Sequence, residues 1–164
     1  MRSKYVFIEK RSKGLLITMV SGLFLVIAAV LSLGVSFSPA LAGETITVYK
    51  SPTCGCCTKW ISHLEDNGFK VNAIDTKDMY KVKKEAGLHP GLGSCHTGII
   101  DGYTIEGHVP ASDIKRLLAE RPAVRGLAVP GMPMGSPGME GPRKDRYSVL
   151  TFDDSGKTTV FSTH

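Results

Sequence analysis

Three of the four cysteines in this chain of 164 residues lie within four consecutive positions, and this cluster constrains the fold more than any other feature. The three are Cys54, Cys56 and Cys57, in the order Cys-Gly-Cys-Cys. Residues 45–49 precede them with an alternating, β-branched pattern that predicts a strand. Residues 58–66 follow them with apolar side chains at helical spacing, which predicts a helix. A strand, a C-x-x-C pair and a helix in this order are typical of a thioredoxin-like redox domain.

The sequence after this first helix predicts further strands and helices, and together they indicate an α/β domain. The predicted order is β-α-β-α-β-β-α, followed by a flap rich in Gly, Pro and Met and by a C-terminal β-hairpin. The further elements are strands at 69–74, 97–100 and 103–106, helices at 77–86 and from Pro110 or Ser112 to before Pro122, a flap at 124–142, and hairpin strands at 147–152 and 157–161.

The first 42 residues are typical of a targeting segment. A basic end is followed by an apolar stretch at 14–37 and by Ala-Leu-Ala at 40–42, where small residues mark a signal peptidase site. We therefore predict a signal peptide cleaved after Ala42 and a mature periplasmic domain of residues 43–164. The apolar stretch is also long enough for an uncleaved membrane anchor. An anchor would leave the domain on the same side, because the basic end stays inside.

The charge composition gives no support to a nucleic-acid-binding role. The formal net charge is +5, but nearly all of it belongs to the first 42 residues. Residues 43–164 carry almost equal numbers of basic and acidic side chains. They therefore have no basic excess with which to bind phosphates.

Two structural disulfides are the simplest role for four cysteines in an exported domain, but the spacing disfavours this role. The neighbours Cys56 and Cys57 are too close for an unstrained bridge. Every other pairing requires Cys95 to bridge into a loop that a second short disulfide already closes. Thiols at the start of a helix have lowered pKa values, and the thiolate is both the nucleophile and the metal ligand. The cluster therefore favours redox or metal chemistry.

The predicted topology brings further donor groups to the cysteine cluster. The third strand begins at Cys95 and His96, and the fourth ends next to His108. Because neighbouring strands are antiparallel there, we expect these residues at the end of the sheet where the cluster lies. Thiolate-rich ligation suits Cu(I), Zn(II) or an iron–sulfur centre. Met132 and Met134 in the flap favour Cu(I), because thioethers beside thiolates suit this ion.

The flap at 127–142 has four prolines and little charge, which favours one ordered position. We predict that it packs over the cysteine end and shields the thiolates. Met132 and Met134 would lie nearest the metal, as a cover or as weak thioether donors. Three further histidines are expected at the surface or in loops, the last of them at a frayed terminus: His63, His89 and His164.

Four motifs occur in one order along residues 44–163. They are Cys54-Gly55-Cys56-Cys57, Ser94-Cys95-His96-Thr97-Gly98, Glu106-Gly107-His108-Val109-Pro110-Ala111 and Val129-Pro130-Gly131-Met132-Pro133. Together they resemble the CopG family of exported bacterial copper-resistance proteins, formerly a domain of unknown function. The resemblance implies a thioredoxin-like fold whose cysteines bind Cu(I), with room for a cysteine-bridged multinuclear cluster. It implies copper thiolates at Cys54, Cys56, Cys57 and Cys95, with His96 and His108 as ligands or supporting groups.

The leading hypothesis is an exported copper-binding protein for copper resistance that could also interconvert Cu(I) and Cu(II). Its partners would be copper ions and other periplasmic copper-handling proteins, and no residue is assigned a catalytic role. The alternative is a thioredoxin-like thiol–disulfide oxidoreductase, with Cys54 as nucleophile and Cys57 as resolving thiol. Against it, no tryptophan precedes Cys54, and Cys95-His96 stands where thioredoxin has a proline. A passive domain with two disulfides is supported by composition alone.

Overall fold

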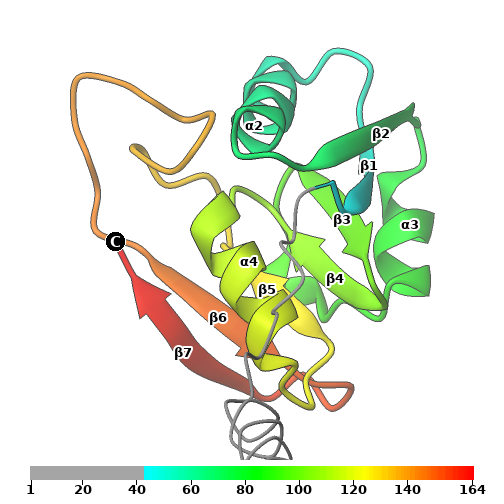
Figure 1. The fold of residues 1–164 in the computed structure, drawn as a ribbon. Helices are drawn as coiled ribbons and strands as arrows, with labels where there is room; N and C mark the ends of the chain where they lie inside the picture. Colours follow the sequence, from blue (N-terminus) through cyan, green and yellow to red (C-terminus); the bar gives the residue numbers. More distant parts are fainter. Residues whose placement is uncertain (1–42) are drawn as a thin grey trace, which may run out of the picture. The chain divides into compact units, whose positions relative to one another are not determined.

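The computed structural model of this protein describes residues 43–164, and the predicted signal peptide or anchor at 1–42 lies outside them. Figure 1 shows the described residues as a sheet with helices packed against it. The elements are β1 (Thr45–Lys50), α2 (Gly55–Asp66), β2 (Lys70–Asp75), α3 (Met79–Glu85), the 3-10 turn η1 (Pro90–Leu92), β3 (His96–Ile100), β4 (Tyr103–Glu106), α4 (Ala111–Glu120), β5 (Gly126–Ala128), β6 (Ser148–Phe152) and β7 (Thr158–Thr163). Among residues 43–164, no helix has the length and apolar character needed to cross a membrane.

The strands of the described residues form one mixed sheet in the order β2-β1-β3-β4-β5-β6-β7. β1 is parallel to β2 and antiparallel to β3, while β4 is antiparallel to β3 and parallel to β5. From β1 to α4 the elements follow the predicted order, so the α/β class is confirmed. The register places Lys50, the last residue of β1, opposite His96, the first residue of β3. This pairing returns Cys95 to the end of the sheet where the cysteine cluster begins.

The short strand β5 lies inside the segment for which the sequence predicts only a flap. Its three residues are buried and pair in parallel with β4. A Cβ at Gly126 would collide with the backbone of Thr104, so this close pairing requires glycine. Three residues are too few to show the alternation that identifies a strand in a sequence.

Helices cover both faces of the sheet (Figure 1). α2 and α4 pack on the face that holds the larger core, whose members include Ile46, Val48, Trp60, Leu64, Ile105, Ile114 and Leu117. α3 packs on the opposite face, where the hydroxyl of Thr104 donates to the carbonyl of Ala86 at 3.0 Å. Neighbouring strand residues point to opposite faces, so Thr104 and Ile105 of β4 mark the two sides. A smaller apolar cluster contains Leu88, Leu92, Ala128 and Phe152.

The predicted C-terminal hairpin is formed by β6 and β7. The backbone N–H of His164 donates to the carbonyl of Tyr147 at 2.9 Å, and its ring Nε2 lies 2.7 Å from Asp113 Oδ2. The expectation of a frayed terminus is therefore wrong, because a buried carboxylate of α4 holds the last side chain. α4 also contacts β7, because the guanidinium carbon of Arg116 lies 3.6 Å from the centre of the Phe161 ring.

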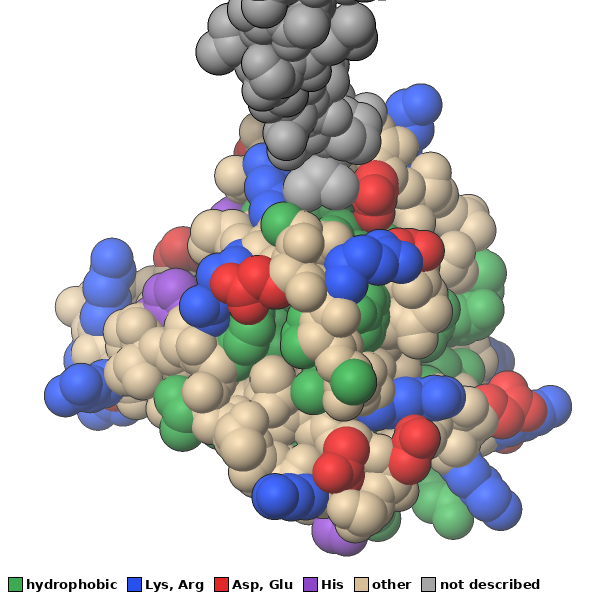
Figure 2. Space-filling view, turned by 60° about the horizontal axis from the view of Figure 1, so that its bottom comes forward, with side chains coloured by type: hydrophobic (Ala, Val, Ile, Leu, Met, Phe, Trp, Pro, Cys, Tyr) green, Lys and Arg blue, Asp and Glu red, His purple; other side chains and the backbone are tan. Residues whose placement is uncertain are grey.

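Charged side chains of both signs are spread over the surface. On the face that Figure 2 shows, Lys and Arg lie among Asp and Glu rather than in a patch of one sign. Arg143 and Asp145, for example, form an exposed ion pair at 2.9 Å. The mixture agrees with the balanced charge of residues 43–164 and offers no extended basic surface on this face.

Candidate metal centre

The cysteine cluster stands where β1 leads into α2. Cys54 is the N-cap residue of α2, and its Sγ accepts a hydrogen bond from the backbone N–H of Cys57 at 3.3 Å. The buried face of α2 fixes how the helix lies: Trp60 is fully buried, and its Nε1–H donates to the carbonyl of Val109 at 2.8 Å. α2 begins three residues before the predicted start at 58, so its first turn holds Cys56 and Cys57 in fixed positions.

All four cysteine sulfur atoms lie within 4.8 Å of one another. In this structure Cys54 and Cys57 form a disulfide, while Cys56 and Cys95 are free thiols. The Cys56 Sγ is 3.5 Å from the Cys54 Sγ and 3.8 Å from the Cys95 Sγ. The predicted meeting of the loop cysteines with Cys95 is therefore confirmed, and their role as ligands stays a prediction.

His108 presents one ring nitrogen to Cys95. Its Nε2 lies 3.1 Å from the Cys95 Sγ, and its Nδ1 lies 2.8 Å from the carbonyl of Pro137. A carbonyl only accepts, so Nδ1 carries the proton and donates it. Burial lowers the pKa of His108, partly opposed by the Pro137 hydrogen bond and by Glu140, so the ring is neutral. Its Nε2 lone pair therefore faces the sulfur, which is the orientation that a metal-binding histidine takes.

His96 is fully buried, and neither of its ring nitrogens has a hydrogen-bond partner among residues 43–164. The ring packs on Trp60 at 4.2 Å between centroids and meets His108 edge-on at 4.9 Å. Burial, with smaller effects of His108 and Lys83, lowers the pKa of His96 to about 3. The side chain is thus neutral, with one ring-nitrogen lone pair and one N–H that are both unused, which fits an imidazole that binds a metal ion.

Cys95 is shared by two groups of candidate metal ligands. One is the group of four cysteine sulfurs, and the other consists of Cys95, His96 and His108, whose ligand atoms lie within 4.8 Å of one another. Burial raises the pKa of the Cys95 thiol to about 11; a hydrogen bond with Ser94 lowers this pKa, and the neighbouring Cys56 raises it. At neutral pH the metal-free protein therefore keeps this thiol protonated, and a bound metal would displace the proton. Sulfur and imidazole donors together suit copper in both of its common oxidation states.

The flap contacts both segments that carry the cysteines, and the shielding of the thiolates stays a prediction. Gly138 (φ +85°) packs so closely on α2 that a Cβ there would lie 2.7 Å from the Cys56 carbonyl oxygen. Further along, Ser94 donates its hydroxyl to the carbonyl of Gly131, whose N–H donates to the carbonyl of Gly93 at 3.4 Å. The flap thus touches the Cys56 loop and the segment before Cys95.

The two flap methionines differ in exposure. Met132 is 55% exposed, so it does not form part of a sealed cover. Met134 is partly buried and packs against Gly141. Their part in binding copper, as weak thioether donors, stays a prediction.

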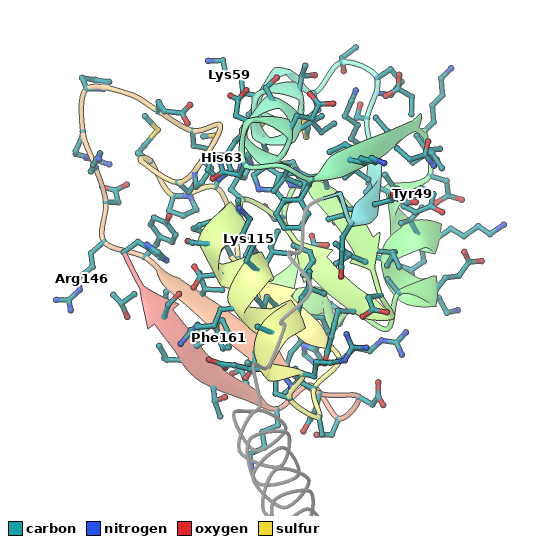
Figure 3. All side chains as sticks on the ribbon, in the orientation of Figure 1. Tyr49, Lys59, His63, Lys115, Arg146 and Phe161 are labelled. Carbon is teal, nitrogen blue, oxygen red and sulfur yellow. A yellow bond between two sulfur atoms is a disulfide. The ribbon has the colours of Figure 1, made fainter. Side chains whose placement is uncertain are left out.

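Two features near the site were not predicted. His63 is expected at the surface, but it lies between α2 and α4 (Figure 3), and its Nε2 accepts a hydrogen bond from the backbone N–H of Ala111 at 3.1 Å. Glu106 is expected only as a residue of a motif, yet its carboxylate is fully buried. In the sequence, the burial of this carboxylate is indicated only by the position of Glu106 at the end of the strand predicted at 103–106.

Comparisons with known proteins agree with the geometry. A family model described as a protein of unknown function, DUF411, matches residues 92–139. Two solved structures of copper resistance protein CopG, described as form 2 and form 1, are similar to this chain. The first is 50% identical, covers 74% of this chain and 98% of its own, and has a TM-score of 0.71. The second is 51% identical, with coverages of 74% and 97% and a TM-score of 0.70.

A search of curated proteins finds no match. The two CopG structures, however, align over nearly their whole length at about half identity. This extent of identity confirms the resemblance seen in the four sequence motifs. The chain belongs to the CopG family.

Proposed function

We propose that this protein is an exported copper-binding protein of copper resistance. The observation that carries the proposal is the meeting of four sulfur atoms and two neutral imidazoles at one end of the sheet. The names of the CopG relatives support copper as the ion. Four sulfurs alone can complete a tetrahedral zinc site, and this would leave the buried His96 ring, whose nitrogens have no hydrogen-bond partner among residues 43–164, unexplained.

The donors divide by the oxidation state that they suit. The thiolates of Cys54, Cys56, Cys57 and Cys95 would hold Cu(I), and sulfurs this close together could bridge more than one ion. Cu(II) prefers nitrogen donors, which His96 and His108 would supply beside Cys95. A site with both kinds of donor could retain copper through a change of oxidation state.

The pair Cys54 and Cys57 offers a source of electrons for such a change. Two Cu(II) ions that each take one electron from this pair would become Cu(I). The two thiols would then join as the disulfide and release two protons. The pair is closed in this structure, which is the product side of that reaction. An external dithiol that supplies two electrons and two protons, and is itself oxidised to a disulfide, would restore the four-thiol site.

Copper analysis of the Cys56→Ser variant tests the proposal. We expect several copper ions per chain in the protein purified under reducing, copper-replete conditions, and fewer in the variant. The reason is that Cys56 lies between the Cys54 and Cys95 sulfurs and would bridge the ions that they hold. Unchanged copper content in the variant would contradict a bridged site.

A thiol–disulfide oxidoreductase is the second candidate, because Cys54 and Cys57 form the disulfide that such an enzyme uses. This function needs only those two cysteines, so Cys56→Ser would keep most of the activity. A metal-free protein that reduces the disulfides of insulin, with Cys56→Ser equally active, would favour it over copper binding.

Export is part of the proposal and rests on the sequence of the first 42 residues. Cleavage after Ala42 would leave a periplasmic protein of residues 43–164, whereas an uncleaved segment would anchor the same domain to the membrane. A mass measurement of the mature protein distinguishes the two.

A further inference from the structure

Glu106 carries a carboxylate in the interior of the domain and is 0% exposed. It lies on β4, directly opposite Thr97 of β3. Its Oε1 accepts hydrogen bonds from Lys83 Nζ and from the backbone N–H of Ser94, the latter at 2.6 Å. Its Oε2 accepts from the hydroxyl of Thr97 at 2.7 Å, and Lys83 also donates to that hydroxyl at 3.1 Å. Every oxygen of the carboxylate is therefore engaged.

These hydrogen bonds hold the segment that carries two of the candidate ligands. Ser94 precedes Cys95, and Thr97 follows His96. The carboxylate therefore accepts hydrogen bonds from the residues on both sides of the Cys95-His96 pair. The residue after Glu106 adds a third attachment, because the N–H of Gly107 donates to the carbonyl of His96 at 3.1 Å.

A buried ion pair is a costly way to join two strands. Taking a carboxylate and an ammonium out of water costs free energy that their attraction only partly returns, and apolar side chains of similar size would often be as stable. The ammonium of Lys83 reaches the carboxylate from α3 with a side chain that is 19% exposed. The hydrogen bonds give the pair something that apolar packing cannot give, a defined position for the backbone beside Cys95.

We propose that Glu106, paired with Lys83, is a positioning residue for the metal site. It fixes where Cys95 presents its sulfur, 3.1 Å from His108 Nε2, and where His96 presents its ring nitrogens. This inference rests on the proposed function in one respect, that the ion these atoms receive is copper.

Two pairs of variants test the inference. Glu106→Gln keeps the shape of the side chain but removes its charge and one acceptor oxygen. Thr97→Val removes the hydroxyl that bonds Oε2, while Thr97→Ser keeps it. We expect Glu106→Gln and Thr97→Val to alter the thiolate-to-copper absorption spectrum and to weaken copper binding about 10- to 100-fold, the usual effect of losing a group that orients a metal ligand. Thr97→Ser should restore the parent spectrum and affinity.

Val149→Ala is the matched control for lost stability. Val149 is fully buried on β6, so the variant should unfold at a lower temperature while keeping the parent spectrum. If Glu106→Gln behaves like this control, with lower stability but an unchanged spectrum and affinity, Glu106 is a structural residue only and the inference is wrong.

A metal-free measurement separates this inference from the proposed function. With the Cys54–Cys57 disulfide closed, only Cys56 and Cys95 can react with iodoacetamide, and peptide mass analysis gives the rate at each. We expect Glu106→Gln to change the rate at Cys95 relative to Cys56. If the parent protein binds no copper, the proposed function fails, and the ratio of the alkylation rates at Cys95 and Cys56 alone tests the role of Glu106. A ratio changed by Glu106→Gln supports positioning by Glu106, and an unchanged ratio overturns it.

Discussion

His96 is fully buried beside Trp60, and neither ring nitrogen has a hydrogen-bond partner within the described part of the chain. A buried polar group without a partner destabilises the folded state by its lost hydration. We predict that His96→Leu raises the free energy of unfolding of the metal-free protein by about 1 kcal/mol. It should also lower the copper content. Urea unfolding and copper analysis measure the two effects.

His108→Leu is the control, because His108 has partners at both ring nitrogens. Its replacement leaves the carbonyl of Pro137 without a donor, so this variant should be less stable than the parent by about 1–2 kcal/mol. A loss of stability in both variants would show that His96 does not destabilise the metal-free fold.

The same His96 variant shows how acid acts on the protein. The pKa of His96 is about 3 in the folded state, below its ordinary value of about 6.5, so the unfolded chain binds a proton that the folded chain does not. Stability is therefore lost as the pH falls from about 6.5 towards 3, by up to about 1.4 kcal/mol per pH unit. His96→Leu should remove this part of the loss. Urea unfolding of both proteins at about pH 7 and about pH 5 checks the sign.

The flap is the element whose position depends most on close backbone contact. Gly138 has a left-handed φ of +85°, and a Cβ there would lie 2.7 Å from the Cys56 carbonyl and 2.9 Å from the Trp60 nitrogen. We predict that Gly138→Ala lifts the flap from α2 and loosens the Pro137 carbonyl from His108. Copper should then pass faster to a chelator, and stability should fall by about 1–3 kcal/mol. Chelator competition and thermal unfolding measure the two effects.

Gly131→Ala provides a control within the same element. Gly131 also has a left-handed φ, +70°, but nothing lies within 4 Å of a Cβ placed there. The backbone strain is thus similar, and only Gly138 adds a collision with the cysteine loop. Equal rates of copper transfer in the two variants would show that the contact of the flap with α2 does not govern access.

Among the helices, strands and turns, those that depend on a local sequence pattern can be predicted from the sequence. The Cys-Gly-Cys-Cys turn, α2 and the return of β3 to the cysteines follow from periodicity and topology. The strand β5 does not, because its three residues are selected by contact with Thr104 across the sheet. The burial of Glu106 does not follow from local pattern either, because its partner Lys83 lies on α3. Only the packing of α3 on the sheet brings the two side chains together.

The whole molecule brings the candidate ligands together from separate parts of the chain. Cys54, Cys56 and Cys57 come from the start of α2, Cys95 and His96 from the start of β3, and His108 from the segment after β4. The ligands therefore cannot stay in place if the sheet unfolds. We infer that copper binding stabilises the fold, as expected for any ligand that binds only the folded state.

Those same sulfur atoms allow two forms of the molecule, which we expect to differ in their capacity for copper. With the Cys54–Cys57 disulfide closed, only Cys56 and Cys95 can supply thiolates; after reduction all four can. We predict that the protein oxidised with diamide binds fewer copper ions per chain than the reduced protein, because a disulfide sulfur is a poor ligand compared with a thiolate. Native mass spectrometry counts the ions in each form.

The double variant Cys54→Ser, Cys57→Ser should bind as few ions as the oxidised parent with or without reductant, since it lacks the pair altogether. Equal copper content in the oxidised and reduced parent would mean that Cys54 and Cys57 are not copper ligands, and that the site consists of Cys56, Cys95 and the two histidines.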